Sequence, residues 1–163
     1  MFRSLRRNKA QDSDLATSQL FDNTTFYNNF LRDLSQSKKE VIIESPFLTT
    51  RRVSMILPTL MKLKRCGVKI IVNTRDPLEQ EGRMQQEAER SMDLLHDAGV
   101  SILFTGGHHR KLAIIDREML WEGSLNILSQ NDSCEVMRRI ESKQLAMQMI
   151  RFIKLDKYLK AVY

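Results

Sequence analysis

The chain reads His109-Arg110-Lys111-Leu112-Ala113-Ile114-Ile115-Asp116 and, after six further residues, Gly123-Ser124-Leu125-Asn126. Residues 111–115 form a short apolar run rich in β-branched side chains, which predicts a buried strand. His109 and Lys111 are two residues apart, so on an extended backbone both side chains leave the same face. Asp116 has an odd spacing from His109 and precedes a predicted second strand, 119–121. We therefore expect Asp116 to orient the site without entering the chemistry directly.

These residue types suit the binding of a phosphate. The ammonium of Lys111 neutralises phosphate oxygens while the imidazole of His109 approaches phosphorus. Glycine at 123 allows a close backbone approach, and Ser124 is a favoured helix N-cap, so the second segment predicts a change from strand to helix. Free N–H groups at such a helix start bind anions, and Ser124 and Asn126 add side-chain hydrogen bonds to the same phosphate.

The elements on either side of this stretch alternate in type. Hydrophobic periodicity predicts helices over residues 24–34, 52–66, 79–98 and from about 143. Short apolar runs predict strands over residues 41–44, 68–72, 100–104 and about 134–140. This alternation indicates the α/β class, with a mixed, largely parallel sheet flanked by helices on both faces. We expect the segments after two of these strands to lie at the sheet edge that holds His109, namely Ser45–Phe47 and Asn73–Pro77.

The N-terminal part of the chain differs from the rest. Residues 1–20 are polar and lack periodicity, and the first nine positions carry four basic residues and no acidic one. We expect residues 1–20 to form a basic, disordered arm and residues 21–163 to form one catalytic domain.

The pattern H-x-K-x4-D-x6-G-S-x-N resembles the catalytic signature of the phospholipase D superfamily, whose members attack phosphodiesters with a histidine. The order of elements from about residue 24 to residue 160 resembles one half of the duplicated phospholipase D fold. The resemblance implies catalytic roles for His109, Lys111, Asp116, Ser124 and Asn126. It also implies a downstream carboxylate that hydrogen-bonds the histidine, and Glu135 is the best positional match.

The motif occurs once in this chain, whereas the resembled family supplies two copies, from two domains or from two subunits. One histidine cannot attack phosphorus and protonate the leaving oxygen in the same step. The economical arrangement is therefore a twofold homodimer with both motifs at its axis. The resemblance also implies a phosphohistidine intermediate, no metal and no other cofactor.

Single-motif members that resemble this chain are most often nucleases. A net charge of +6 and a pI near 9.5 also favour a polyanionic partner such as DNA or RNA. We expect single strands to enter such a site more readily than a stiff duplex. The residues expected to contact the substrate are Gly123, Arg51, Arg52 and Arg75. The resemblance extends to modules found with helicases, so it implies a helicase or another DNA-processing protein as a partner.

Two alternatives stay open at this point. One is a phosphodiesterase that acts on an anionic phospholipid such as cardiolipin, although no segment is convincingly amphipathic enough to dock on a membrane. The other is a nucleic-acid-binding module whose site does not turn over. The intact motif argues against the second alternative.

Composition sets the remaining expectations. A hydrophobic fraction of 42% and a charged fraction of 28% are typical of a globular protein. The N-terminal residues lack the apolar core of a signal peptide, and no apolar segment approaches ~20 residues, so we expect a cytoplasmic protein, or a domain of a larger one, without a membrane span. Cys66 and Cys134 lack metal-ligand spacing and are expected to be buried thiols. His96 is expected to be structural, and His108 to flank the site or to be exposed.

Overall fold

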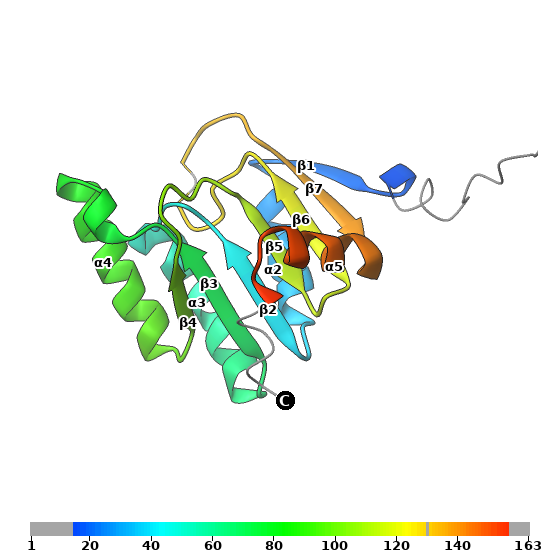
Figure 1. The fold of residues 1–163 in the computed structure, drawn as a ribbon, viewed down its shortest axis with the longest axis horizontal. Coiled ribbons are helices and arrows are strands. Elements are labelled where there is room, and N and C mark those ends of the chain that lie inside the picture. The colour runs from blue at the N-terminus through cyan, green and yellow to red at the C-terminus, as the bar shows by residue number, and fades with distance from the viewer. Residues whose placement is uncertain (1–14, 130, 157–163) are drawn as a thin grey trace, which may run out of the picture.

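The computed structural model describes residues 15–129 and 131–156, which form one mixed sheet with helices on both faces (Figure 1). The strand order is β1-β7-β6-β5-β2-β3-β4. The strands are β1 (Gln19–Asp22), β2 (Glu40–Glu44), β3 (Lys69–Thr74), β4 (Ser101–Phe104), β5 (Leu112–Ile115), β6 (Met119–Gly123) and β7 (Val136–Glu141). The helices are α2 (Phe26–Ser35), α3 (Thr50–Arg65), α4 (Gly82–Asp97) and α5 (Lys143–Phe152), with a 3-10 turn, η1 (Pro77–Glu79), before α4.

The expected α/β class and mixed sheet are confirmed, but the parallel part of the sheet is smaller than expected. β3 runs parallel to β2 and to β4, and the other four pairings among the described strands are antiparallel. The reason is the path of the chain after β4. No described helix crosses the sheet between β5, β6 and β7, so each strand returns antiparallel to the one before it.

Two apolar layers cover the sheet. On one face, under α2, α3 and α4, the rings of Phe26 and Phe30 pack against Trp121 of β6. On the other face, Ile150 of α5 belongs to a second cluster that includes Ile114 of β5. Figure 1 shows α5 in front of the sheet, with α2 and α3 behind it. Burial on both faces explains why β5 is apolar along its whole length.

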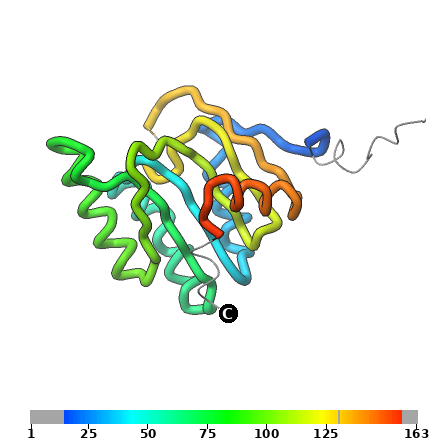
Figure 2. Tube along the Cα trace, in the orientation of Figure 1, coloured from blue at the N-terminus to red at the C-terminus, as the bar shows by residue number. Residues whose placement is uncertain are grey.

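One edge of the sheet collects the segments that the sequence singled out. Glu44 of β2 pairs with Leu112 of β5, and Gly123 of β6 pairs with Met137 of β7, so these strand ends lie level. β3 and β4 run parallel to β2 and end at the same edge. Figure 2 shows the loops after β2, β4 and β6 gathered at the top of the view. We call this the upper edge, and it confirms the expected place of the segments after β2 and β3.

Two expectations about local structure are wrong. No helix begins at Ser124, because the backbone of Ser124 pairs with Val136 and residues 127–129 form a turn. Cys66 and Cys134 are exposed and not buried, since Cys66 caps the end of α3 and Cys134 lies in the loop before β7.

The beginning of the chain is only partly described. β1 contains residues 19 and 20, so the sheet begins two residues before the expected domain boundary at residue 21. Residues 1–14 of the expected arm lie outside the described residues. Within residues 15–129 and 131–156, no helix combines the length and the apolar character needed to cross a membrane.

Candidate active site

His109 and Lys111 meet at the upper edge, just before β5. Nζ of Lys111 lies 3.1 Å from Nδ1 of His109 and donates to the carbonyl oxygen of His109 at 2.8 Å. His109 is exposed, and its ring packs edge-on against Phe47 with a centroid distance of 5.9 Å. Partial burial lowers the pKa of Lys111, and the charge of Glu135 offsets part of this effect. The expected pairing of imidazole and ammonium is confirmed.

An ion pair between the half-exposed Arg110 and a buried carboxylate holds the backbone next to His109. The carboxylate of Glu44, at the end of β2, is 0% exposed and accepts hydrogen bonds from Nε and Nη2 of Arg110. Nδ2 of Asn73 donates to the same carboxylate at 2.8 Å. A buried carboxylate requires such partners, so Arg110 is fixed in place. The fixed arginine in turn sets the position of the histidine that precedes it.

His108 is a second anchor of the same loop. It is 2% exposed, its Nδ1 accepts from the backbone N–H of Arg110 at 3.2 Å, and its Nε2 lies 3.1 Å from the carbonyl oxygen of Asn73. These partners fit a neutral ring with its proton on Nε2. Burial lowers the pKa of His108, while the charge of Glu44 opposes the shift. His108 therefore flanks the site as expected, and the alternative expectation that it is exposed is wrong.

Gly123 and Ser124 lie where β6 approaches β7. A Cβ atom at residue 123 would collide with the carbonyl oxygen of Val136 and with Cα of Met137, so only glycine fits. The backbone N–H of Ser124 donates to the carbonyl oxygen of Val136 at 2.9 Å, and its Oγ accepts from the N–H of Val136 at 3.1 Å. Because Oγ acts as an acceptor there, the hydroxyl proton of Ser124 stays available for a phosphate.

The loop that carries Asn126 is tied to the core on both sides. The hydroxyl of Tyr27 donates to the carbonyl oxygen of Ile127 at 2.9 Å, and the N–H of Leu128 donates to Oγ of Ser45 at 3.1 Å. Burial raises the pKa of Tyr27 to about 12, which keeps it a donor. Oδ1 of Asn126 is buried and has no hydrogen-bond partner among the described residues. Asn126 is thus held at the upper edge with an unused acceptor.

Glu135 lies in the loop before β7, where its charge acts on Lys111. Its Oε1 accepts from the hydroxyl of Ser133 at 2.8 Å. Among the described residues, no hydrogen bond joins Glu135 to His109. The carboxylate expected to orient the histidine therefore lies near the site but bonds to a different group.

Asp116 lies at the opposite end of β5 from His109. Its carboxylate accepts four hydrogen bonds at 2.8–2.9 Å, from the hydroxyl of Ser37 and from the backbone N–H groups of residues 38–40. Burial would raise the pKa of Asp116, but these hydrogen bonds outweigh it and leave the pKa below its ordinary value. The structure does not bring Asp116 to the other catalytic candidates, because the whole of β5 separates them. It fixes the turn before β6 to the start of β2.

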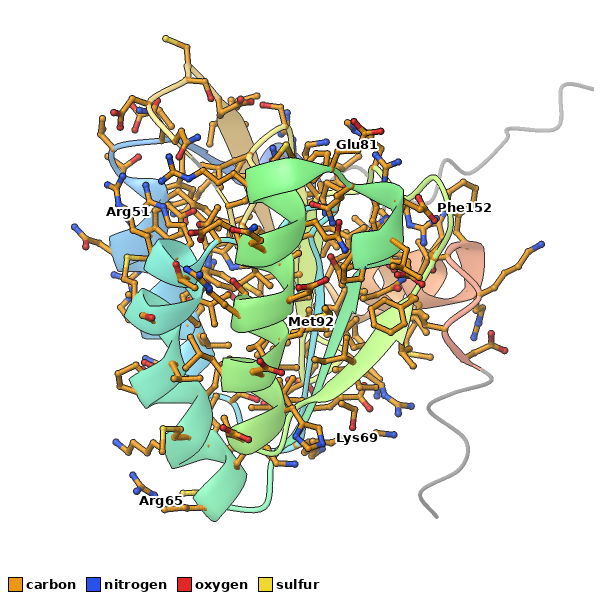
Figure 3. The ribbon with its side chains drawn as sticks, turned by 90° about the vertical axis from the view of Figure 1, so that its left-hand side faces the viewer. Arg51, Arg65, Lys69, Glu81, Met92 and Phe152 are labelled. Atoms are coloured by element: carbon orange, nitrogen blue, oxygen red, sulfur yellow. The ribbon has the colours of Figure 1, made fainter. Side chains whose placement is uncertain are left out.

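The three arginines expected to bind substrate differ in position. Arg51 is exposed and lies at the upper end of α3, as Figure 3 shows. The guanidinium of Arg75 bonds to Glu79 at 3.1 Å and lies 5.7 Å from the centroid of the Phe47 ring. Arg52 instead lies over an aromatic ring of α2, at 4.3 Å from its centroid. Arg51 and Arg75 therefore reach the upper edge, whereas Arg52 packs against α2.

The upper edge carries an exposed imidazole, an ammonium beside it, a serine hydroxyl and an asparagine amide. No three His, Cys, Asp or Glu side chains among residues 15–129 and 131–156 are grouped to hold a metal ion. A family model described as "Cardiolipin synthase, PLD-like domain" matches residues 30–156, which is more than half of the chain. The chain belongs to this phospholipase D-like family. Members of the phospholipase D superfamily act on phosphodiester bonds.

Solved structures of two proteins of similar size share the fold. Nuc from Salmonella typhimurium, titled a phospholipase D family member, has a TM-score of 0.68 and 16% identity, over 83% of this chain and 90% of its own. NucT from Helicobacter pylori has a TM-score of 0.65 and 16% identity, over 84% of this chain and 92% of its own.

A larger protein contains the same fold as one part. Polyphosphate kinase from Porphyromonas gingivalis has a TM-score of 0.66 and 13% identity, over 92% of this chain and 27% of its own. At such identities these similarities establish the fold alone. No curated protein matches the chain by sequence.

Sequence reasoning missed the buried anchor of this phospholipase D-like site, which consists of Glu44, Asn73 and Arg110. A signal was present, because Glu44 ends an apolar run, 41–43, that predicts a buried strand. A carboxylate there needs a cation. Arg110 stands inside the motif, but the sequence gives no distance between it and Glu44.

Proposed function

We propose that this protein is a metal-independent phosphodiesterase, and that it is a nuclease cleaving DNA or RNA through a phosphohistidine intermediate. The observation that carries the proposal is the contact of 3.1 Å between Nζ of Lys111 and Nδ1 of the exposed His109. A fixed cation beside an exposed imidazole suits attack on a phosphorus whose oxygens are negatively charged. The net charge of +6 supports a polyanionic substrate.

Two imidazoles are needed for the reaction. In the first step, Nε2 of one His109 bonds to phosphorus, the bond from phosphorus to the leaving oxygen breaks, and Nε2 of a second His109 protonates that oxygen. In the second step, the second ring takes a proton from water, the water oxygen attacks phosphorus, and the phosphorus–nitrogen bond breaks. The products are an alcohol and a phosphomonoester, and both rings return to their starting forms.

The two rings need different protonation states. The acid is an imidazolium with a proton on both Nδ1 and Nε2, because a neutral ring that gave up its only proton would become an imidazolate; in this form its Nδ1 no longer accepts from Lys111. The attacking ring needs its proton on Nδ1 and an acceptor for it. We assign this acceptor role to Glu135, which would exchange its hydrogen bond with Ser133 for one with the ring.

We assign the second ring to a second copy of the chain, in a twofold homodimer, because the motif occurs once. The surface beside Lys111 supports a protein contact. A groove of about 530 Å³ connects Lys111 to the exposed apolar side chains of Leu20, Val136 and Phe152. Phe152 is 78% exposed and lies on the side of the sheet away from α3 (Figure 3). Exposed apolar groups gathered in one groove favour burial by a partner.

A phospholipid phosphodiesterase is the second candidate. Two observations favour it, the family description as a cardiolipin synthase domain and the apolar groove that begins at Lys111. Such a groove also fits the acyl chains of an anionic lipid. The basic arginines at the upper edge, Arg51 and Arg75, favour the nucleic acid instead, because phosphate contacts along a backbone require spaced cations.

The experiment that tests the proposal gives the purified protein a choice of substrates in excess EDTA. The substrates are labelled single-stranded and double-stranded DNA, RNA, cardiolipin vesicles and bis(p-nitrophenyl) phosphate. We expect cleavage of the nucleic acids and of the small diester, with single strands preferred, and no cleavage by His109→Ala.

Other outcomes would replace the proposal. Activity that EDTA abolishes and an added metal restores contradicts the metal-free scheme. Cleavage of cardiolipin without cleavage of nucleic acid selects the second candidate. A gel shift that survives His109→Ala, with no cleavage by the wild type, selects a binding module that does not turn over.

A further inference from the structure

A pocket lies beside His109, and apart from Asn126 its lining takes no part in the proposed chemistry. It has a volume of about 640 Å³, and its lining includes Phe47, Arg51, Gln80, Arg83, Met84 and Asn126. These residues come from the start of α3, the start of α4 and the loops after β2 and β6. Figure 3 shows Arg51 and Glu81 at the upper ends of α3 and α4. Since the ring of Phe47 contacts His109, the pocket adjoins the position of the reacting phosphate.

Two buried amide atoms of the pocket lack partners. Gln80 is 7% exposed, and its Nε2 forms no hydrogen bond with any described residue. Oδ1 of Asn126 is also buried and accepts no hydrogen bond from a described residue. The backbone N–H of Gln80 donates to the carbonyl oxygen of Pro77 at 2.9 Å, which fixes the glutamine at the end of η1. Buried polar atoms are normally satisfied, so an unpaired donor and an unpaired acceptor in one pocket indicate a ligand that supplies both partners.

The charges of the pocket favour a ligand that carries phosphate. Arg51 and Arg83 are exposed, and neither forms an ion pair with a described residue. The anionic side chain of the pocket is Glu87, whose Oε2 already accepts from the N–H and the hydroxyl of Thr50, at 2.9 and 2.7 Å. Hydrogen bonds from Thr50 and, more weakly, the charge of Arg83 lower the pKa of this carboxyl, so Glu87 is engaged at the start of α3. The guanidinium groups of Arg51 and Arg83 are exposed and accessible to phosphates.

We propose that this pocket binds the base of a nucleotide adjacent to the cleaved phosphate, and we call it the base pocket. The proposal deepens the proposed nuclease function and rests on it. A nucleobase presents donors and acceptors on one edge, which match Nε2 of Gln80 as donor and Oδ1 of Asn126 as acceptor. The side chains of Phe47 and Met84 offer surfaces for its flat face. An acyl chain would leave both amide atoms unpaired, so a lipid tail fits the base pocket poorly.

The direct test uses the wild-type protein and single-stranded oligonucleotides that differ in the position of one abasic site. At the position next to the cleaved phosphate, we expect loss of the base to raise KM by about tenfold, since stacking and edge contacts with that base disappear. Loss of a base far from the cut should leave KM unchanged. Equal KM values for all abasic positions would overturn the base pocket.

A variant of Gln80 tests the same pocket from the protein side. Gln80→Met removes the unpaired donor and keeps the length of the side chain, so we expect a higher KM for oligonucleotides and unchanged turnover of bis(p-nitrophenyl) phosphate. The melting temperature should stay equal or rise, because a buried unsatisfied amide is removed. Gln86→Met, on the exposed surface of α4, is the matched control and should change neither quantity.

The outcomes separate this inference from the function on which it rests. If the wild type cleaves neither bis(p-nitrophenyl) phosphate nor oligonucleotides, both the nuclease function and the base pocket are excluded. Normal cleavage of both, with no effect of abasic sites or of Gln80→Met, overturns the base pocket and leaves the nuclease standing. A lower melting temperature of Gln80→Met, without a change in KM, assigns Gln80 a structural role and also overturns the proposal.

Discussion

Nζ of Lys111 lies 3.1 Å from Nδ1 of His109, and the same ammonium donates to the carbonyl oxygen of His109 at 2.8 Å. The ammonium bridges Nδ1 of the ring and the backbone carbonyl of the same residue, which restrains the imidazole. Nε2 is then the ring nitrogen left for a substrate. The two contacts also place a positive charge beside the position where phosphate oxygens would lie. Lys111 therefore acts on both the ring and the substrate in the proposed reaction.

Lys111→Met removes this charge and keeps the length of the side chain. We expect turnover of bis(p-nitrophenyl) phosphate to fall by about 100- to 1,000-fold, as for loss of a group that stabilises charge in the transition state. The free energy of unfolding should change by less than about 1 kcal/mol, because Lys111 forms no buried ion pair. Lys111→Arg, which keeps the charge, should retain part of the turnover. Turnover of Lys111→Met within threefold of the wild type would exclude a direct role for the ammonium.

Asp116 should act on stability and not on chemistry. Asp116→Asn keeps a side chain that tolerates the positive φ of 54° at this residue but removes the charge that receives four hydrogen bonds. We expect the free energy of unfolding, measured in urea at pH 7, to fall by about 2 kcal/mol. The kcat of the folded fraction should stay within about twofold of the wild type. A large loss of kcat with unchanged stability would return Asp116 to the catalytic group.

The lowered pKa of Asp116 also sets the pH range of this effect. A carboxyl whose folded pKa lies below its unfolded pKa of about 3.9 stabilises the fold above that value and loses the contribution as pH falls through the folded pKa. The difference in stability between the wild type and Asp116→Asn should therefore shrink in acid. A difference that grows below pH 4 would contradict the assignment.

Arg110 and Glu44 should show strong coupling in a double-mutant cycle. Arg110→Met leaves the fully buried carboxylate of Glu44 without its cation, which we expect to cost about 3–5 kcal/mol of unfolding free energy. Replacing both partners, with Arg110→Met and Glu44→Leu, should cost less than Arg110→Met alone. Urea unfolding gives the free energy of unfolding of Arg110→Met, of Glu44→Leu and of the double variant. Additive losses would mean that the ion pair does not anchor the loop before His109.

His108 predicts a pH dependence of stability near neutrality. Burial lowers its folded pKa, so the neutral ring stabilises the fold above the unfolded pKa of about 6.5, and the contribution is lost as pH falls from there toward the folded pKa. We expect the wild type to lose more unfolding free energy than His108→Gln between about pH 7.5 and 5.5. His96→Gln, at an exposed histidine, is the matched control and should behave like the wild type. Equal pH dependence of the wild type and His108→Gln would contradict a buried neutral ring.

The sequence predicted the elements of the fold better than their directions. The runs at 41–44, 68–72 and 111–115 identify strands because burial on both faces favours mostly apolar, β-branched residues. The direction of each strand depends on the segment that connects it to the next strand, and the run from β5 to β7 contains no apolar helix that could signal a crossover. The expected helix at Ser124 was wrong because pairing of its backbone with Val136 outweighs the N-cap preference of serine.

The sequence predicted the local contacts of the site but not the contacts between distant segments. Local spacing places His109 beside Lys111, since residues two apart on extended backbone share a face. Spacing cannot show that Arg110 pairs with the buried carboxylate of Glu44, or that Gln80 and Asn126 line one pocket, because these residues lie far apart in the chain. Asp116 shows that closeness in sequence does not guarantee closeness in space. It belongs to the motif by spacing, but it lies at the other end of β5 from His109.

The central claim is that His109 rings from two copies of the chain act on one phosphorus, and subunit mixing tests it most directly. Wild-type and His109→Ala proteins are unfolded together in equal amounts, refolded, and assayed with bis(p-nitrophenyl) phosphate in EDTA. If each site needs two intact rings, only wild-type pairs are active, and activity per total protein should be about one quarter of the wild-type value. A value of about one half, proportional to the wild-type fraction, would mean that each copy acts alone and would contradict the account.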